Sequence, residues 1–229
     1  MPIFSNVLAG AAGQGGAAEY VIPKSLRFNS GDSAHLSRTP TSAGNRRTWT
    51  WSAWVKRSKL GERVALFTAG SDNTEILFEP DDVLRIYFYP GSYAGHTKTV
   101  ASFRDTSAWY HIVVAIDTTQ TGNDNIAKIY VNGVQQEVTH PNNWTTNGQT
   151  DVNNTVAHYI GSRFGPARLI NACMADVQLV DGQALAPTDF GETRSSDGVW
   201  VPKEFDGTYG TNGFHLNFSD SSTNEALGF

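Results

Sequence analysis

The chain has 229 residues and a net charge of −5, with acidic and basic residues mixed along its length. This balance argues against nucleic acid as the main partner. Thr, Val, Ile and aromatic residues are plentiful, 22 residues are Gly and only 2 are Met, so long helices are excluded. A single all-β domain with a short tail is the expectation for this length.

The single cysteine and the start of the chain bear on where the protein is made. Cys173 excludes an internal disulfide, and the apolar run around it predicts a buried small side chain. No apolar stretch approaches the roughly 20 residues that a membrane-spanning helix needs. The first 20 residues lack the basic region of a signal peptide. We therefore expect folding in a reducing cytoplasm without Sec export, and no membrane span.

Residues 1–22 differ in composition from the rest of the chain. They begin with apolar residues and become rich in Gly and Ala with almost no charge, which is typical of a flexible linker. A frayed terminus is one interpretation. Apolar side chains beside a flexible linker favour another, an N-terminal attachment arm that docks on a partner through Ile3, Phe4, Val7 and Leu8. Residues 23–229 then form one domain.

From residue 25 onward, short extended segments alternate with turn signals. The longest alternation covers residues 48–58, where Trp49, Trp51, Ala53 and Val55 share one face of the predicted strand. Further strands are predicted at residues 25–29, 34–39, 63–70, 74–79, 83–89, 99–104, 109–117, 126–138, 157–164, 171–181 and 213–218, and one helical turn at 186–190.

The connections between these segments indicate antiparallel pairing. Asn132-Gly133 is a strong hairpin signal, because both turn positions need positive φ. No strand–helix–strand unit is apparent in the pattern. About a dozen short strands with such turns predict a sandwich or a barrel.

Several segments together resemble the concanavalin A-like lectin/glucanase superfamily in its laminin-G-like branch. The similarity is carried by residues 25–29 (SLRFN), 50–56 (TWSAWVK), 109–114 (WYHIVV), 128–134 (KIYVNGV), 159–162 (YIGS), 171–179 and 185–191. It extends in order over residues 25–218. The resemblance implies an all-β fold, a two-sheet antiparallel jelly-roll sandwich with one short helical turn and a flexible N-terminal arm.

A narrower resemblance concerns residues 25–39, 175–192 and 197–205. These stretches are similar to laminin-G-like proteins of tailed bacteriophages, which occur among virion appendages behind a short attachment segment. The resemblance implies a virion structural protein, made in the host cytoplasm and joined to other virion proteins through residues 1–22. Such parts are expected to be homo-oligomers with cyclic symmetry, here a trimer.

The sequence gives little support for catalysis. Glucanases of the resembled superfamily carry a Glu-x-Asp-x-x-Glu strand whose carboxylates flank the scissile bond, and this chain has no such motif. Glu75 and Glu79 are the closest pair, interpreted as solvated charge near a strand end. No Gly-x-Ser-x-Gly elbow, dinucleotide motif or metal-ligand spacing is present. We expect no enzyme activity, no cofactor and no metal, although the Asp81-Asp82 turn could help to ligate calcium.

Two loops have the chemistry of a sugar site, which combines an aromatic ring with fixed polar groups. Residues 89–96 offer Tyr89, Tyr93 and His96 beside glycines. Residues 140–147 offer Asn142, Asn143 and Trp144 on a loop predicted to be exposed. Packing under a long loop, or contact with a neighbouring subunit, is the alternative for each, because Tyr and Trp are also enriched at interfaces.

Two hypotheses for function remain open at this point. The first is a bacteriophage fibre, spike or capsid-decorating subunit that displays the sandwich, with host surface glycans as a candidate ligand. The second is a free-standing lectin or glycan-active protein of the same fold. The two are compatible, since an appendage can adsorb to host polysaccharide.

Overall fold

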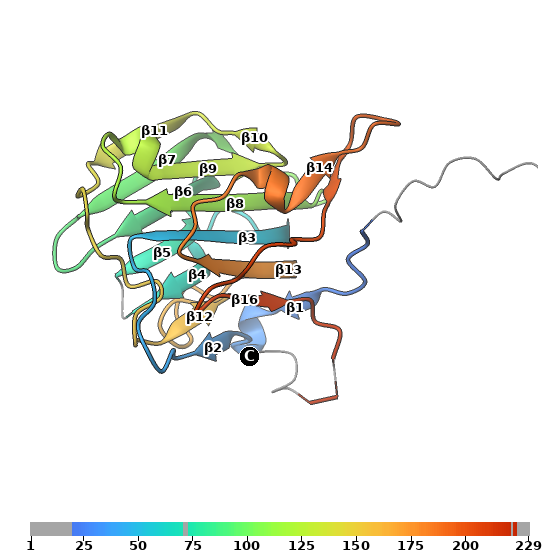
Figure 1. Ribbon diagram of the computed structural model, residues 1–229. Coiled ribbons are helices and arrows are strands. Elements are labelled where there is room, and N and C mark those ends of the chain that lie inside the picture. Colours follow the sequence, from blue (N-terminus) through green and yellow to red (C-terminus); the bar gives the residue numbers. More distant parts are fainter. Residues whose placement is uncertain (1–19, 71–72, 221, 224–229) are drawn as a thin grey trace, which may run out of the picture.

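Two antiparallel sheets of seven strands each face one another in the computed structural model (Figure 1), which describes residues 20–70, 73–220, 222 and 223. Within these residues, helical structure is limited to three short turns, η1 (Ser30–Asp32), α1 (Asn123–Ile126) and η2 (Pro187–Asp189). The predicted all-β sandwich is therefore confirmed. No helix among the described residues is long and apolar enough to cross a membrane.

The first sheet, sheet A, is built around the long strand β3. Its order is β1-β13-β3-β8-β9-β10, and β16 also pairs with β13. The strand bounds are β1 (Leu26–Phe28), β3 (Thr48–Arg57), β8 (Tyr110–Asp117), β9 (Ala127–Val131), β10 (Val134–Gln135), β13 (Ala172–Asp181) and β16 (Phe214–Leu216). Asn132 and Gly133 turn between β9 and β10 with φ of 50° and 79°, which confirms the predicted hairpin.

The second sheet, sheet B, has the order β11-β7-β6-β5-β4-β12-β2. Its strands are β2 (Leu36–Arg38), β4 (Val64–Ala69), β5 (Thr74–Phe78), β6 (Val83–Phe88), β7 (Gly95–Ser102), β11 (Val138–Asn142) and β12 (His158–Ile160). Both predicted sugar loops are shorter than expected, because β7 begins at Gly95 and β11 extends to Asn142. A separate ribbon pairs β14 (Gly191–Thr193) with β15 (Trp200–Pro202).

The core lies between the sheets and is fixed by the alternation of β3. Trp49, Trp51, Ala53 and Val55 point inward and are fully buried. The Trp51 ring stacks on Phe67 of sheet B, with centroids 6.2 Å apart. Burial of such aromatic area is the main stabilising contribution in a sandwich of this size.

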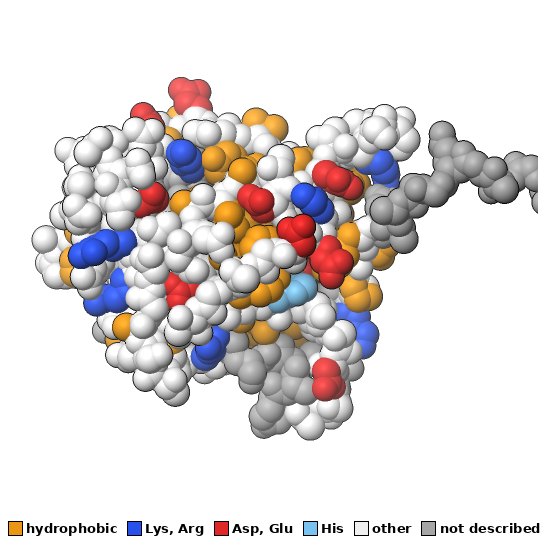
Figure 2. Space-filling model, viewed as in Figure 1, with side chains coloured by type: hydrophobic (Ala, Val, Ile, Leu, Met, Phe, Trp, Pro, Cys, Tyr) orange, Lys and Arg blue, Asp and Glu red, His pale blue; other side chains and the backbone are white. Residues whose placement is uncertain are grey.

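The opposite face of sheet A is covered by the C-terminal part of the chain. Val113 and Val180 on the sheet pack with Phe190, and Phe205 and Tyr209 lie against this cluster. Figure 2 shows acidic and basic side chains interspersed over this side of the molecule. Cys173, predicted to be buried, is instead partly exposed, because its strand position lies opposite Arg27 and Lys56 on this outer face.

A buried ion pair closes one end of the core. Arg57, at the end of β3, donates from Nη2 to Asp82 Oδ1 at 2.8 Å, and its guanidinium lies 3.9 Å from the centre of the Phe78 ring. Burial alone would raise the pKa of Asp82, but hydrogen bonds from Gly61 N, Arg57 and Arg104 outweigh it and lower that pKa. Asp82 is therefore held as a carboxylate by two separate segments of chain, residues 57–61 and Arg104.

Asp82→Ala should lower the free energy of unfolding by about 3–5 kcal/mol, because it leaves the Arg57 guanidinium buried without a carboxylate. Glu62→Ala is the matched control, since its pair with Lys59 is exposed and should contribute less than about 1 kcal/mol. Urea denaturation of both variants at neutral pH measures the difference. Equal losses of stability would contradict the role assigned to the buried pair.

Candidate functional site

The outer face of sheet B carries two rows of side chains that are, apart from Leu77, polar or aromatic. Side chains alternate along a strand, so the residues between the core positions Ile76, Phe78 and Ile86 face outward. Cross-strand register then aligns Glu75, Tyr87, His96 and Asn142 in one row, and Leu77, Arg85, Lys98 and Thr139 in the next.

The loop between β6 and β7 folds back over the first row. Tyr93 is 48% exposed, and its ring stacks on His96 with centroids 5.7 Å apart and planes 20° apart. Tyr89 meets Tyr93 edge to face at 4.9 Å. His96 Nδ1 lies 3.4 Å from Asn142 Oδ1. Four predicted residues therefore meet, and we name Tyr89, Tyr93, His96 and Asn142 the tyrosine–histidine face.

A charged network supports the tyrosine–histidine face. Arg85 forms an ion pair with Glu79, whose other oxygen accepts from Arg63 Nε at 2.7 Å. Arg85 Nη2 donates to the Tyr93 hydroxyl at 3.2 Å. Burial alone would raise the pKa of Glu79, but the two arginines outweigh it and lower that pKa. Tyr93 is thus tied to a carboxylate that stays ionised.

The interpretation of Glu75 and Glu79 as solvated charge is wrong. Glu75 is fully buried and forms ion pairs with Arg163, at 2.8 Å, and with Arg168. Glu79 is 8% exposed and paired as described above. The loop that carries both Glu75 partners lies almost 90 residues further along the chain, so local sequence gave no sign of this burial. Among the described residues, no group of three or more His, Cys, Asp or Glu side chains could hold a metal ion.

The second predicted loop, residues 140–147, does not present its aromatic ring to solvent. Trp144 is 5% exposed, and its Nε1 donates to Thr97 Oγ1 at 2.8 Å. A side chain at Gly95 would come within 2.3 Å of the Trp144 ring, so the two residues pack directly. The expectation of an exposed Trp144 is therefore wrong, because the ring fills the core under β7. Asn143 is exposed and accepts from Asn123 Nδ2 at 2.8 Å, away from the tyrosine–histidine face.

His96 lines a small pocket beside the tyrosine–histidine face. The pocket has a volume of about 300 Å³ and is bounded by Glu79, Pro80, Asp81, Arg85, His96 and Lys98. Burial, together with the nearby Arg85 charge, lowers the pKa of His96 to about 4. The imidazole is therefore neutral at physiological pH, and this pocket offers hydrogen-bonding groups rather than a titrating catalyst.

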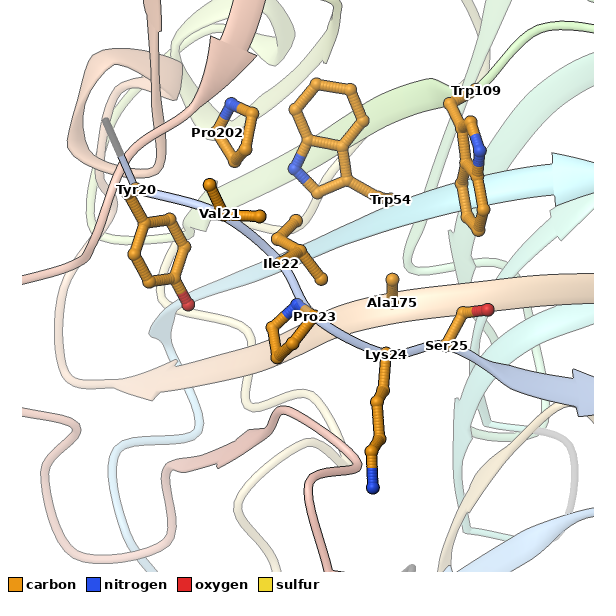
Figure 3. Close-up of a pocket in the computed structure, with 10 residues that line it drawn as sticks. All are labelled: Tyr20, Val21, Ile22, Pro23, Lys24, Ser25, Trp54, Trp109, Ala175 and Pro202. Atoms are coloured by element: carbon orange, nitrogen blue, oxygen red, sulfur yellow. The ribbon is translucent and has the colours of Figure 1, made fainter. Parts of the chain in front are cut away.

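A second pocket, which sequence reasoning missed, lies on the outer face of sheet A (Figure 3). The segment Tyr20–Ser25 crosses β3 and β13 there, with Ile22 directed toward the Trp54 ring. Tyr20 donates to Asp176 Oδ1 at 3.0 Å, which fixes the segment. The volume is about 460 Å³ and the lining is mainly apolar. The attachment candidates Ile3, Phe4, Val7 and Leu8 lie outside the described residues.

A serine–histidine contact on the same face has no catalytic geometry. His111 Nδ1 accepts from Trp200 Nε1 at 2.9 Å, and indole can only donate. The proton of the neutral ring therefore resides on Nε2, which donates to Ser52 Oγ at 2.9 Å. A general base would need this nitrogen unprotonated. The pair is a structural contact inside the layer that covers sheet A.

Comparison with known proteins agrees with this architecture. A family model named Laminin_G_3 and described as the concanavalin A-like lectin/glucanases superfamily matches residues 29–189. No curated protein matches the chain. A candidate carbohydrate binding protein from Bacteroides ovatus is similar with a TM-score of 0.58 and 15% identity, over 85% of this chain and 52% of that one. This chain thus spans about half its length.

A mutant of NanB sialidase from Streptococcus pneumoniae is also similar, with a TM-score of 0.50 and 13% identity. The match covers 76% of this chain and 29% of the sialidase. At such identities the two likenesses establish the shared fold.

Three buried histidines predict a stability loss in mild acid. Burial lowers the pKa of His96 and His158 to about 4 and that of His111 to about 3. In the unfolded chain their pKa is about 6.5. The stability they contribute is thus complete above about pH 6.5 and declines as pH falls toward 4, by at most roughly 1.4 kcal/mol per pH unit for each ring.

Urea denaturation at a series of pH values between about 7 and 5 checks this expectation, because most carboxylates stay ionised over that interval. The midpoint should fall steadily as pH is lowered. A midpoint that stays constant or rises would show that these imidazoles are not held neutral.

Proposed function

Because the chain belongs to the concanavalin A-like lectin/glucanases superfamily, we propose that it is a non-catalytic carbohydrate-binding protein whose sugar site is the tyrosine–histidine face. The observation that carries the proposal is the cross-strand row that sets the exposed Tyr93 ring beside His96 and Asn142. This arrangement joins an apolar platform to fixed polar groups on a rigid sheet.

The chemistry of this face fits a sugar ring. The C–H face of a pyranose packs on an aromatic ring, while its hydroxyls need donors and acceptors in set positions. Tyr93 is held by its stacking on His96 and its bond to Arg85, so little conformational freedom is lost on binding. The Asn142 amide and the neutral His96 ring supply polar groups beside it.

The charged groups near this face support binding without cleavage. A glycosidase needs a carboxylic acid with a raised pKa opposite a second free carboxylate. Here the pKa of Glu79 is lowered, and both Glu75 and Glu79 are neutralised by arginines. Neither is placed to donate a proton to a glycosidic oxygen.

Tyr93→Ala and Asn142→Ala should each weaken binding by about tenfold or more, which corresponds to about 1.4 kcal/mol. A glycan array identifies the ligand, and calorimetry on the variants measures its affinity. Phe164→Ala is a matched control, since this ring is 58% exposed and belongs to another loop. Binding that survives both face variants, or release of reducing sugar by the wild-type protein, would contradict the proposal.

We further propose that the protein acts as a displayed subunit of a bacteriophage virion, a fibre, spike or capsid decoration. The support is the similarity of residues 25–39, 175–192 and 197–205 to laminin-G-like virion proteins. In this setting the chain is made in the host cytoplasm, residues 1–22 join other virion proteins, the subunits form a trimer, and host surface glycans are the ligand. A free-standing lectin is the alternative.

Removal of residues 1–19 tests whether the N-terminal segment attaches the protein to the virion. It leaves the Tyr20 contact to Asp176 in place. The truncated protein should keep the thermal transition and sugar binding of the full chain, yet be absent from purified particles in which the full chain is detected by mass spectrometry. Normal incorporation of the truncated protein into particles would contradict the hypothesis that the N-terminal segment attaches the protein to the virion. Absence of the full chain from particles would favour the free-standing lectin.

A further inference from the structure

Two buried nitrogen atoms at the small pocket of sheet B lack hydrogen-bond partners. They are His96 Nε2 and Arg85 Nε, and both residues line the pocket of about 300 Å³. His96 is 9% exposed and Arg85 is 8% exposed. Leaving a buried polar group unpaired costs about 1–3 kcal/mol, so such groups in a native fold need an explanation. A bound ligand supplies one.

The two atoms have opposite hydrogen-bonding roles. Arg85 Nε carries a proton and can only donate. His96 Nδ1 faces Asn142 Oδ1, an acceptor, at 3.4 Å, so Nδ1 carries the proton of the neutral ring. His96 Nε2 is then an acceptor. Two residues that line the pocket, on the neighbouring strands β6 and β7, thus carry one unpaired donor and one unpaired acceptor.

From this pairing we infer that the site selects a neutral sugar through one hydroxyl, which accepts from Arg85 Nε and donates to His96 Nε2. This inference rests on the proposed function and adds the ligand class. A hydroxyl is the sugar group that both donates and accepts at one oxygen. A carboxylate or sulfate has no proton to give to His96, and an ammonium has no lone pair for Arg85, so an ionised group cannot fill this position and a charged sugar would also have to present a hydroxyl here.

Charge in the pocket agrees with a neutral ligand. Glu79 is already paired with Arg85 and Arg63, so the Arg85 charge is compensated before a ligand arrives. Lys98 and the exposed Asp81 add one charge of each sign at the rim. Among the residues that line the pocket, the two positive charges of Arg85 and Lys98 balance the two negative charges of Glu79 and Asp81, so the lining offers an anionic sugar no net positive charge.

Access requires a small side-chain shift, since both nitrogen atoms are closed off from solvent. The Lys98 side chain is the one best able to make this shift. The residue pairs with Arg85 across the strands and is partly exposed, and its side chain makes no hydrogen bond or ion pair with another described residue. Its long flexible chain can move aside at little energetic cost, whereas Arg85 is held by Glu79 and by the Tyr87 ring, 4.4 Å away.

Two substitutions of His96 separate the two ring nitrogens. The amide of His96→Gln can place an acceptor near the position of Nε2, whereas that of His96→Asn reaches only the position of Nδ1. We expect His96→Asn to weaken binding of the array-identified sugar by about tenfold, and His96→Gln to retain most of it. His35→Asn, on the turn before β2, is the matched control, and thermal melting verifies the fold of each variant.

A direct readout uses protein labelled with ¹⁵N at histidine. Titration with D-glucose, D-galactose and D-mannose, and with D-glucuronate and D-galacturonate, distinguishes the ligand classes. We expect a neutral sugar to move the His96 Nε2 resonance in the direction of hydrogen-bond acceptance and to leave Nδ1 nearly unchanged. The uronates should bind no more tightly than the neutral sugars.

The outcomes separate this inference from the function on which it rests. If Tyr93→Ala abolishes sugar binding while His96→Asn and the His96 resonance are unaffected, the face is a sugar site and the hydroxyl pair is wrong. Preference for the uronates would contradict the neutral ligand class, whereas the His96 resonance and the His96→Asn variant decide the hydroxyl pair. If no sugar binds in the array or in the titration, the proposed function fails, and the inference fails with it.

Discussion

The register of β5, β6, β7 and β11 is the constraint on which the candidate site depends. It sets Glu75 opposite Tyr87, Tyr87 opposite His96, and His96 opposite Asn142. A slip of one residue would turn Arg85 and His96 into the core, where an uncompensated charge costs several kcal/mol. The register is held from inside by core residues such as Ile86, and by Trp144, whose Nε1 bonds Thr97 beneath β7.

Electrostatics then determine what this face can do. The acids on the outer face of sheet B are matched by arginines from other segments, Arg63 for Glu79 and Arg163 with Arg168 for Glu75. Full pairing stabilises the carboxylate form and removes the proton donor that hydrolysis requires. His96 Nε2 and Arg85 Nε lack hydrogen-bond partners, and they can bind a neutral group without changing protonation. This pattern supports the proposed binding role.

Features that depend on neighbouring residues in the sequence could be predicted, whereas those that depend on contacts between distant parts of the chain could not. The alternation of β3 and the Asn132-Gly133 turn depend on neighbouring residues, so both were predictable from sequence. Burial of Glu75 depends on a loop far along the chain, and burial of Trp144 depends on the missing side chain of Gly95. Tyr89, Tyr93 and His96 could be grouped from the sequence because they share one loop. The sequence did not place Asn142 in the same site, because Asn142 meets His96 only through the register between β7 and β11.

The proposed sugar site and the first described residues lie on opposite faces of the sandwich. The described chain begins on the outer face of sheet A, where Tyr20 bonds Asp176 and Ile22 approaches Trp54. The tyrosine–histidine face lies on the outer side of sheet B, with the shared core between them. A subunit held through the segment that precedes Tyr20 would therefore keep its sugar face clear of the attachment. This opposition suits a displayed binding domain, because a contact on sheet A leaves the register of sheet B undisturbed.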